Sequence, residues 1–152
     1  MNHAEEIANA THEIFSSMIM LDVTAKEALR RTDPTFHHSI SGIIGLAGSI
    51  KGNLAIHLPS TVATAVTTAF LGMEVEEVGE DVCDAIGELA NMLAGAIKTA
   101  LDPSGSDIKL SMPSTVYGDE YSLDCFDKGI SIMVPFALEN EVFNVELQLL
   151  EN

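Results

Sequence analysis

The chain has 152 residues, the size of one ordinary domain, and we expect residues 1–152 to fold as a single unit. Hydrophobic residues make up 47% and charged residues 20%, which is typical of a globular protein and excludes a disordered one. Acidic residues number 23 and Lys and Arg together 7, so the formal net charge is −16. This excess argues against a nucleic-acid partner and against docking on an anionic membrane.

The first half of the chain predicts a helix, two strands and a second helix. Apolar residues recur at helical spacing over residues 4–21. Residues 37–49 and 52–58 are rich in Ile and Gly and predict a pair of strands. A second helix is expected to begin with Ser60 as its N-cap and to end at Gly72.

The second half predicts a longer helix followed by strands. The helix is expected over residues 78–101, and the strands over 108–116, 129–138 and 142–150. A helix precedes strands in each half, which suggests a pseudo-two-fold arrangement; whether it arose by duplication stays open. We therefore expect an α+β fold in two layers, with long helices packed on a largely antiparallel sheet.

The third helix combines an apolar stripe with a narrow acidic ridge. Residues 74–88 contain seven acids and no base. At about 100° per residue, one stripe of the helix carries a polar set: Glu77, Asp81, Asp84, Glu88, Asn91 and Gly95. For the early acids, an ordinary solvated face is the simpler interpretation.

Glu88 and Asn91 form a Glu-x-x-Asn pair one helical turn apart, and Gly95 follows one turn later. A carboxamide both donates and accepts hydrogen bonds, so it can orient a water molecule without titrating. Gly95 leaves room for another protein to approach. The spacing alone is weakly specific, because Glu6/Asn9 and Glu141/Asn144 share it.

The residues around this pair resemble a known family. The run from Asp84 to Lys98, Asp-Ala-Ile-Gly-Glu-Leu-Ala-Asn-Met-Leu-Ala-Gly-Ala-Ile-Lys, resembles the signature helix of the CheC/CheX family of chemotaxis phosphatases. Residues 43–54 resemble its Gly-rich hairpin, residues 113–118 its Pro-x-x-Val-x-Gly strand, and residues 15–18 part of its first helix. The resemblance extends over residues 8–150.

The resemblance implies an activity and roles for particular residues. Family members dephosphorylate the phospho-aspartate of CheY-like response regulators. Asn91 would then hold the attacking water, Glu88 would pair with the regulator's active-site lysine, and Asp84 and Gly95 would lie in the partner-binding surface. The phosphatase would bind no metal of its own, and the regulator would supply Mg²⁺.

The sequence of the first predicted helix indicates which of the two branches of the family the chain resembles. CheC-like members carry the Glu/Asn pair on both long helices, whereas here the matching turn reads Glu13-Ile-Phe-Ser16. A single competent site fits the CheX-like branch, whose members tend to be homodimers, so a homodimer is expected. The alternative is a non-catalytic module of the same fold that binds a response regulator or another signalling partner.

The remaining chemistry-bearing residues give weaker signals. Gly42, Gly45 and Gly48 lack the lysine of a phosphate-binding loop and predict close packing under a helix. No histidines show the spacing of a zinc site, and no Ser–His–acid grouping is suggested by the order of elements. Two cysteines are too few for a disulfide framework, and the acidic N-terminus is unlike a signal peptide, so the cytoplasm is the expected location.

Overall fold

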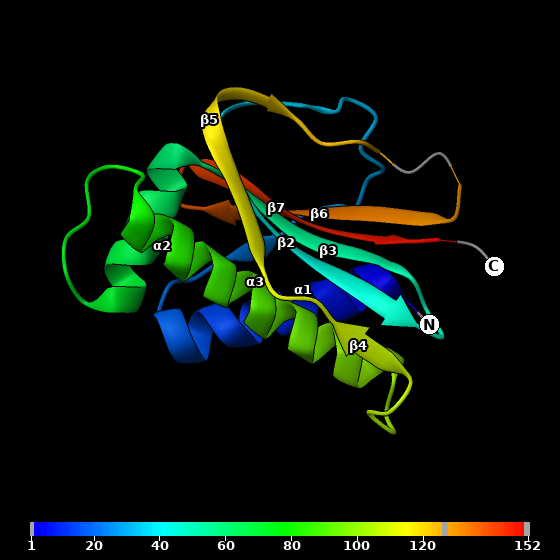
Figure 1. The fold of residues 1–152 in the computed structure, drawn as a ribbon. Coiled ribbons are helices and arrows are strands. Elements are labelled where there is room, and N and C mark those ends of the chain that lie inside the picture. Colours follow the sequence, from blue (N-terminus) through cyan, green and yellow to red (C-terminus); the bar gives the residue numbers. More distant parts are fainter. Residues whose placement is uncertain (1, 126–127, 151–152) are drawn as a thin grey trace.

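The computed structural model describes residues 2–125 and 128–150. The chain forms helices and strands in the following order: α1 (His3–Ile14), the π-helix η1 (Phe15–Ile19), β1 (Thr24–Ala25), β2 (Thr35–Gly48), β3 (Gly52–Pro59), α2 (Ser60–Leu71), α3 (Glu80–Leu101), β4 (Ile108–Leu110), β5 (Ser114–Ser122), β6 (Ile130–Leu138) and β7 (Glu141–Leu149). Figure 1 shows α1, α2 and α3 together on one face of the sheet. The predicted α+β architecture with long helices on an antiparallel sheet is confirmed.

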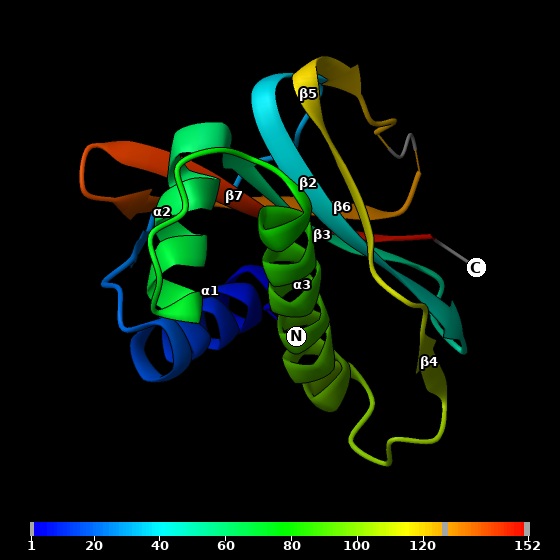
Figure 2. The same ribbon diagram turned by 60° about the vertical axis from the view of Figure 1, so that its left-hand side comes forward.

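The strands follow the order β1-β6-β7-β3-β2-β4, with β5 also paired to β2, and each of these pairs is antiparallel. α1 contacts β6 and α3 contacts β2, so the helix of each half packs on the strands of the other half. The two halves meet where β3 pairs with β7 at the centre of the sheet. Because each half contributes a helix that packs on strands of the other half, the fold agrees with the predicted pseudo-two-fold arrangement. Figure 2 shows the three helices on the same side of the sheet from a second direction.

Successive side chains along each strand point alternately toward the helices, where they form the core, and toward the opposite face of the sheet. Side chains that point toward the helices form one hydrophobic cluster with them, for example Leu54, Ile56 and Leu58 of β3. Their neighbours of opposite parity, such as His57, point to the other face. That face is covered by the connection between β1 and β2 and by the end of β5, which meet where the Leu123 amide donates to the Pro34 carbonyl.

The first helix differs from its prediction. The α-helix ends at Ile14 and continues as a π-helix, instead of running unbroken from residue 4 to 21. The hydroxyls of Ser16 and Ser17 both donate to the Glu13 carbonyl, a local bond that competes with regular helix geometry. The wider turn buries Ile19 and leaves Met18, one of the apolar residues of the predicted helix 4–21, 56% exposed.

Other boundaries were also predicted incorrectly. Ser60 is the first residue of α2 and not its N-cap, because Pro59 still belongs to β3 and the Ser60 hydroxyl donates to the His38 carbonyl. The end of α2 at Gly72, with φ 71°, is confirmed. α3 begins at Glu80 with Gly79 as its N-cap, so Glu77 precedes the helix instead of lying on its ridge.

The predicted strand over residues 108–116 is two strands. β4 ends at Leu110 and β5 begins at Ser114, because Ser111 bonds to the Gly45 backbone and Pro113 has no N–H to offer a ladder. β5 continues to Ser122 through an exposed, polar edge segment that hydrophobic alternation does not reveal.

Candidate functional site

The helix α3 carries the candidate site and is fixed by its apolar stripe. Val82, Ile86, Leu89, Leu93 and Ile97 recur at helical spacing and are each at most 3% exposed. Acids in the first turn and a lysine in the last turn complement the helix dipole. The opposite face therefore remains in solvent over the length of the helix.

The C-terminal end of α3 is held by one carboxylate. Asp102 follows the helix and accepts hydrogen bonds from the amides of Gly105, Asp107 and Ile108 and from the Ser104 hydroxyl. Burial alone would raise the pKa of the Asp102 carboxyl, but these hydrogen bonds hold its pKa below the usual value. The ionised side chain ties the end of the helix to the start of β4.

Gly42 lets β2 approach α3 closely, and the chain before β5 lies beside the helix at Gly87. A Cβ on Gly42 of β2 would lie 3.1 Å from the Ile86 side chain and 3.2 Å from the Ala90 side chain, so the helix rests on the strand at this point. The close packing under a helix predicted for the three glycines is confirmed at Gly42, whereas Gly45 and Gly48 lie close to Ser111 and to the Asp107 backbone instead. On α3 itself, a Cβ on Gly87 would lie 3.6 Å from Pro113, so the chain before β5 flanks the helix.

Glu88 and Asn91 both lie exposed on the outer face of α3, as predicted. Neither side chain has a hydrogen bond or ion pair with any residue that the structure describes. Asp84, one turn before Glu88, is also exposed. A Cβ on Gly95 would have no other atom within 4 Å, so the surface stays open one turn beyond Asn91. The geometry brings the four predicted residues onto one accessible strip.

The first helix offers a poorer version of this arrangement. Ser16, at the position that matches the Asn of the motif, lies in the π-helix. Its hydroxyl donates to the Glu13 carbonyl at 3.2 Å, so its proton is turned back toward the helix.

Among residues 2–125 and 128–150, no three His, Cys, Asp or Glu side chains are placed to hold a metal ion. No helix in this described part of the chain is both long and apolar enough to span a membrane.

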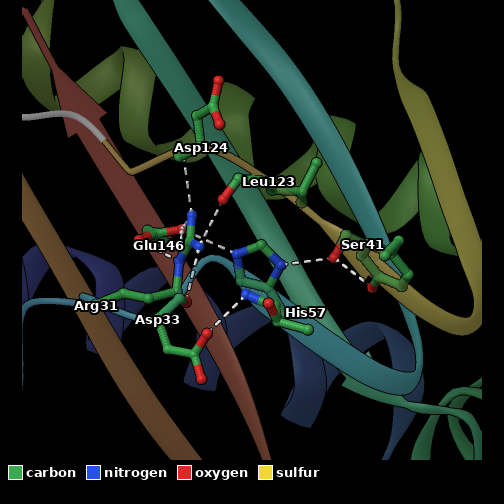
Figure 3. A network of polar contacts seen from close by, with 9 residues as sticks. Arg31, Asp33, Ser41, His57, Leu123, Asp124 and Glu146 are labelled. Carbon is green, nitrogen blue, oxygen red and sulfur yellow. Dashed lines mark hydrogen bonds and ion pairs between the residues drawn. The ribbon is translucent and has the colours of Figure 1, made fainter.

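A second polar cluster lies on the other face of the sheet, where the sequence predicted no grouping (Figure 3). Ser41 Oγ lies 2.6 Å from His57 Nδ1, and His57 Nε2 lies 3.0 Å from Glu146 Oε1. Arg31 donates to both carboxylate oxygens of Glu146, and the Tyr121 hydroxyl lies 2.8 Å from Ser41 Oγ. Adjacent strands bring these side chains together, and only knowledge of the strand register could have revealed the cluster.

The hydrogen-bond directions in this cluster follow from Glu146. An ionised carboxylate only accepts, so His57 donates to it from Nε2 and accepts from Ser41 at Nδ1. Ser41 then accepts from Tyr121. Although this is a serine, a histidine and an acid in contact, Ser41 is completely buried with its hydroxyl engaged on both sides, so no substrate can reach it. We assign the cluster a structural role.

Burial sets the protonation of this cluster. Desolvation lowers the pKa of His57, and its hydrogen bond to Glu146 offsets only part of that effect. Burial alone would raise the pKa of Glu146, but hydrogen bonds from His57 and Arg31 lower it. Arg31 also donates to the carbonyls of Leu123 and Asp124, and so fastens both covering segments to the sheet.

Comparisons with known proteins agree with the resemblance in the sequence. A family model described as chemotaxis phosphatase CheX matches residues 40–137. The CheY-P phosphatase CheX of Thermotoga maritima is 32% identical over 105 residues, which are 68% of this chain and 66% of that protein, just under two thirds of its length.

Solved structures extend the similarity over nearly the whole chain. The chemotaxis protein CheX of Desulfovibrio desulfuricans superimposes with a TM-score of 0.84 at 26% identity, covering 96% of this chain and 97% of that one. The CheX of a Borrelia burgdorferi CheX–CheY–BeF3–Mg²⁺ complex shares the fold, with a TM-score of 0.83 at 22% identity over 99% of both chains.

Proposed function

Because the chain belongs to the CheX family of chemotaxis phosphatases, we propose that it hydrolyses the phospho-aspartate of a CheY-like response regulator. The observation that carries this proposal is the Glu88–Asn91 pair, exposed on α3 and without a partner in the described chain. Both residues of the phosphatase motif are retained in a geometry that leaves them free for another protein. The curated relative from Thermotoga maritima bears the name of this activity.

In the proposed reaction, Asn91 enters the regulator's active site and orients a water molecule in line with the phosphorus atom. The water oxygen attacks phosphorus, the bond from phosphorus to the aspartate oxygen breaks, and the carboxylate and inorganic phosphate are released. Phosphoryl transfer asks mainly for alignment and charge stabilisation, which a neutral amide can supply. Glu88 pairs with the regulator's lysine and holds the two proteins in register.

The metal belongs to the regulator in this proposal. Mg²⁺ bound there neutralises the phosphoryl oxygens, and this chain contributes no ligand to it. The complex of the Borrelia burgdorferi relative contains Mg²⁺ together with CheY and BeF3, which supports the presence of Mg²⁺ in the proposed complex. We also propose that the protein acts in the cytoplasm as a homodimer. Asp84 and Gly95 complete the docking strip beside the catalytic pair.

The test is phosphate release from a Mg²⁺-loaded, phosphorylated CheY-type receiver domain. Wild-type protein should shorten the lifetime of the phosphate. Asn91→Ala should lower the accelerated rate by about 10²–10³-fold and leave complex formation largely intact, because the amide acts mainly in the transition state. Glu88→Ala should weaken both binding and rate, since a docking charge is lost.

Asn9→Ala is the matched control, because Asn9 is exposed on α1 in a Glu-x-x-Asn tetrad of its own. This variant should behave like wild type. If a receiver binds but neither wild type nor Asn91→Ala changes its phosphate lifetime, the chain is a binding module and the phosphatase proposal is wrong.

A further inference from the structure

The chain makes a β-bulge beside α3. Ser111 exchanges hydrogen bonds with Gly45, since its amide donates to the Gly45 carbonyl and its hydroxyl accepts from the Gly45 amide. The next paired residue is Ser114, opposite Ile43. Ile44 is therefore opposed by two residues, Met112 and Pro113. Bulges of this kind redirect side chains and are frequent next to functional sites.

The bulge lies against the part of α3 that carries the site. Pro113 neighbours Gly87, since a Cβ added at Gly87 would lie 3.6 Å from the Pro113 side chain. Gly87 and Asn91 are four residues apart on the helix, so they lie on the same side, one above the other. β4 lies near the C-terminal end of α3 and β5 runs back toward its N-terminal end (Figure 1). Met112 precedes Pro113, so it comes before that contact on a chain that runs from the C-terminal toward the N-terminal end of α3, and Asn91 follows Gly87 toward the C-terminal end.

Met112 is left in water at this place. Its side chain is 86% exposed, more than Met20 at 79% or Met73 at 56%. Single exposed apolar residues are common, so exposure alone decides nothing. What distinguishes Met112 is its place in the chain: the hydrogen bonds of Ser111 to Gly45 fix the backbone directly before it, and Pro113 directly after it neighbours Gly87, one helical turn before Asn91.

We propose that Met112 contacts the receiver domain docked on Glu88 and Asn91 and helps to determine which receiver is accepted. This inference rests on the proposed function. The bulge forms one wall of the docking surface, continuous with the strip on α3, and the flexible thioether adapts to an apolar patch on the partner. The contact exists before and during the reaction, so it contributes to binding and not to the chemical step.

The experiment measures binding and turnover separately. Binding is titrated with a CheY-type receiver domain loaded with Mg²⁺ and beryllofluoride, and turnover is measured at saturating phosphorylated receiver. Met112→Ala should weaken binding by about 5–10-fold and leave kcat within about twofold of wild type. This pattern is expected when the lost contact stabilises the bound receiver equally in the ground state and in the transition state. Met112→Glu should weaken binding further. Met73→Ala, an exposed methionine after α2, is the control and should match wild type.

The outcomes separate this inference from the proposed function. If both Met112 variants bind like wild type while Asn91→Ala still abolishes turnover, the phosphatase stands and the role of Met112 is overturned. A fall in kcat with unchanged binding overturns it as well. If wild type binds no receiver, both proposals fall. Unfolding curves of the Met112 variants should overlay wild type, because the side chain is solvent-exposed.

Discussion

At the scale of single residues, Gly95 shows a position that the fold alone does not explain. It lies inside α3, where glycine costs about 0.5–1 kcal/mol relative to alanine, yet an added Cβ would touch nothing within 4 Å. The Thr99 hydroxyl bonds to its carbonyl, which alanine would also permit. The chain therefore forgoes helix stability at a place where the proposed partner approaches.

Gly95→Ala should consequently raise the free energy of unfolding by about 0.5–1 kcal/mol and weaken receiver binding. Urea unfolding and a titration with the beryllofluoride-loaded receiver measure the two effects. Gly95→Leu should weaken binding more strongly, since a larger side chain fills the open space. Unchanged binding by both variants would remove Gly95 from the docking surface and leave Asn91 and Glu88 as its core.

His57 makes the stability of the fold depend on pH. The unfolded chain takes up the proton near its ordinary pKa of 6.5, whereas desolvation holds the pKa of the buried imidazole lower in the folded protein. Below about pH 6.5 the unfolded state thus binds more protons. The contribution of His57 to stability is complete above this pH and is lost as the pH falls toward the folded pKa.

Urea unfolding between pH 7.5 and 5.5 should show the free energy falling by up to about 1.4 kcal/mol per pH unit from this residue. His57→Gln keeps a neutral donor for Glu146 but cannot titrate, so its curve should fall less steeply. NMR of the His57 ring should show a neutral imidazole in the folded protein at pH 6.5. An imidazole that titrates at or above that value would contradict the assignment.

At the scale of elements, the contact between β2 and α3 sets the position of the site. Gly42→Ala would place a methyl group 3.1 Å from the Ile86 side chain and 3.1 Å from its carbonyl oxygen, tighter than most real Cβ contacts, so α3 would have to shift by a few tenths of an ångström. We expect a loss of about 1–3 kcal/mol of stability by overpacking, together with lower phosphatase activity as α3 shifts.

Gly118→Ala in β5 is the control for that substitution, because nothing in its own chain lies within 4 Å of its added Cβ, and both variants are compared at protein concentrations low enough to keep the β5 edge unpaired. Urea unfolding of the two variants provides the comparison. Equal stabilities would mean that α3 moves away without cost and that Gly42 does not fix the helix. Activity normalised to the folded fraction then separates displacement of the site from simple unfolding.

The sequence predicted some elements well because their cause is local. Burial along α3 follows from its own period, so the exposure of Glu88 and Asn91 could be expected without knowing its neighbours. The π-helix and the break at residues 111–113 depend on serine hydroxyls that bond to the backbone, which periodicity does not register. The His57 cluster depends on register across β2, β3 and β7, which no single strand encodes.

At the scale of the whole molecule, an open sheet edge and a large net charge act against each other. β5 pairs with β2 along one side, and within residues 2–125 and 128–150 no strand pairs with its other side. Such an edge invites pairing with a second chain, and its first residues, Ser114–Gly118, carry no charge. Asp119 and Glu120 farther along the strand, and the net charge of −16, repel a second copy.

We therefore predict a two-fold dimer that continues the sheet through β5 and tightens with salt. Light scattering at micromolar concentration should give about twice the chain mass of 16.2 kDa. The dimer dissociation constant should fall as NaCl rises from about 0.05 to 0.5 M, because screening removes the repulsion but leaves the strand pairing in place. Tyr117→Asp, on the exposed edge, should weaken the dimer, since it adds like charges across the two-fold axis. The dimer dissociation constant of this variant should depend on salt more strongly than that of wild type. A 16.2 kDa monomer at both salt concentrations would show that this edge is protected by its own acids and that the site on α3 works in a single chain.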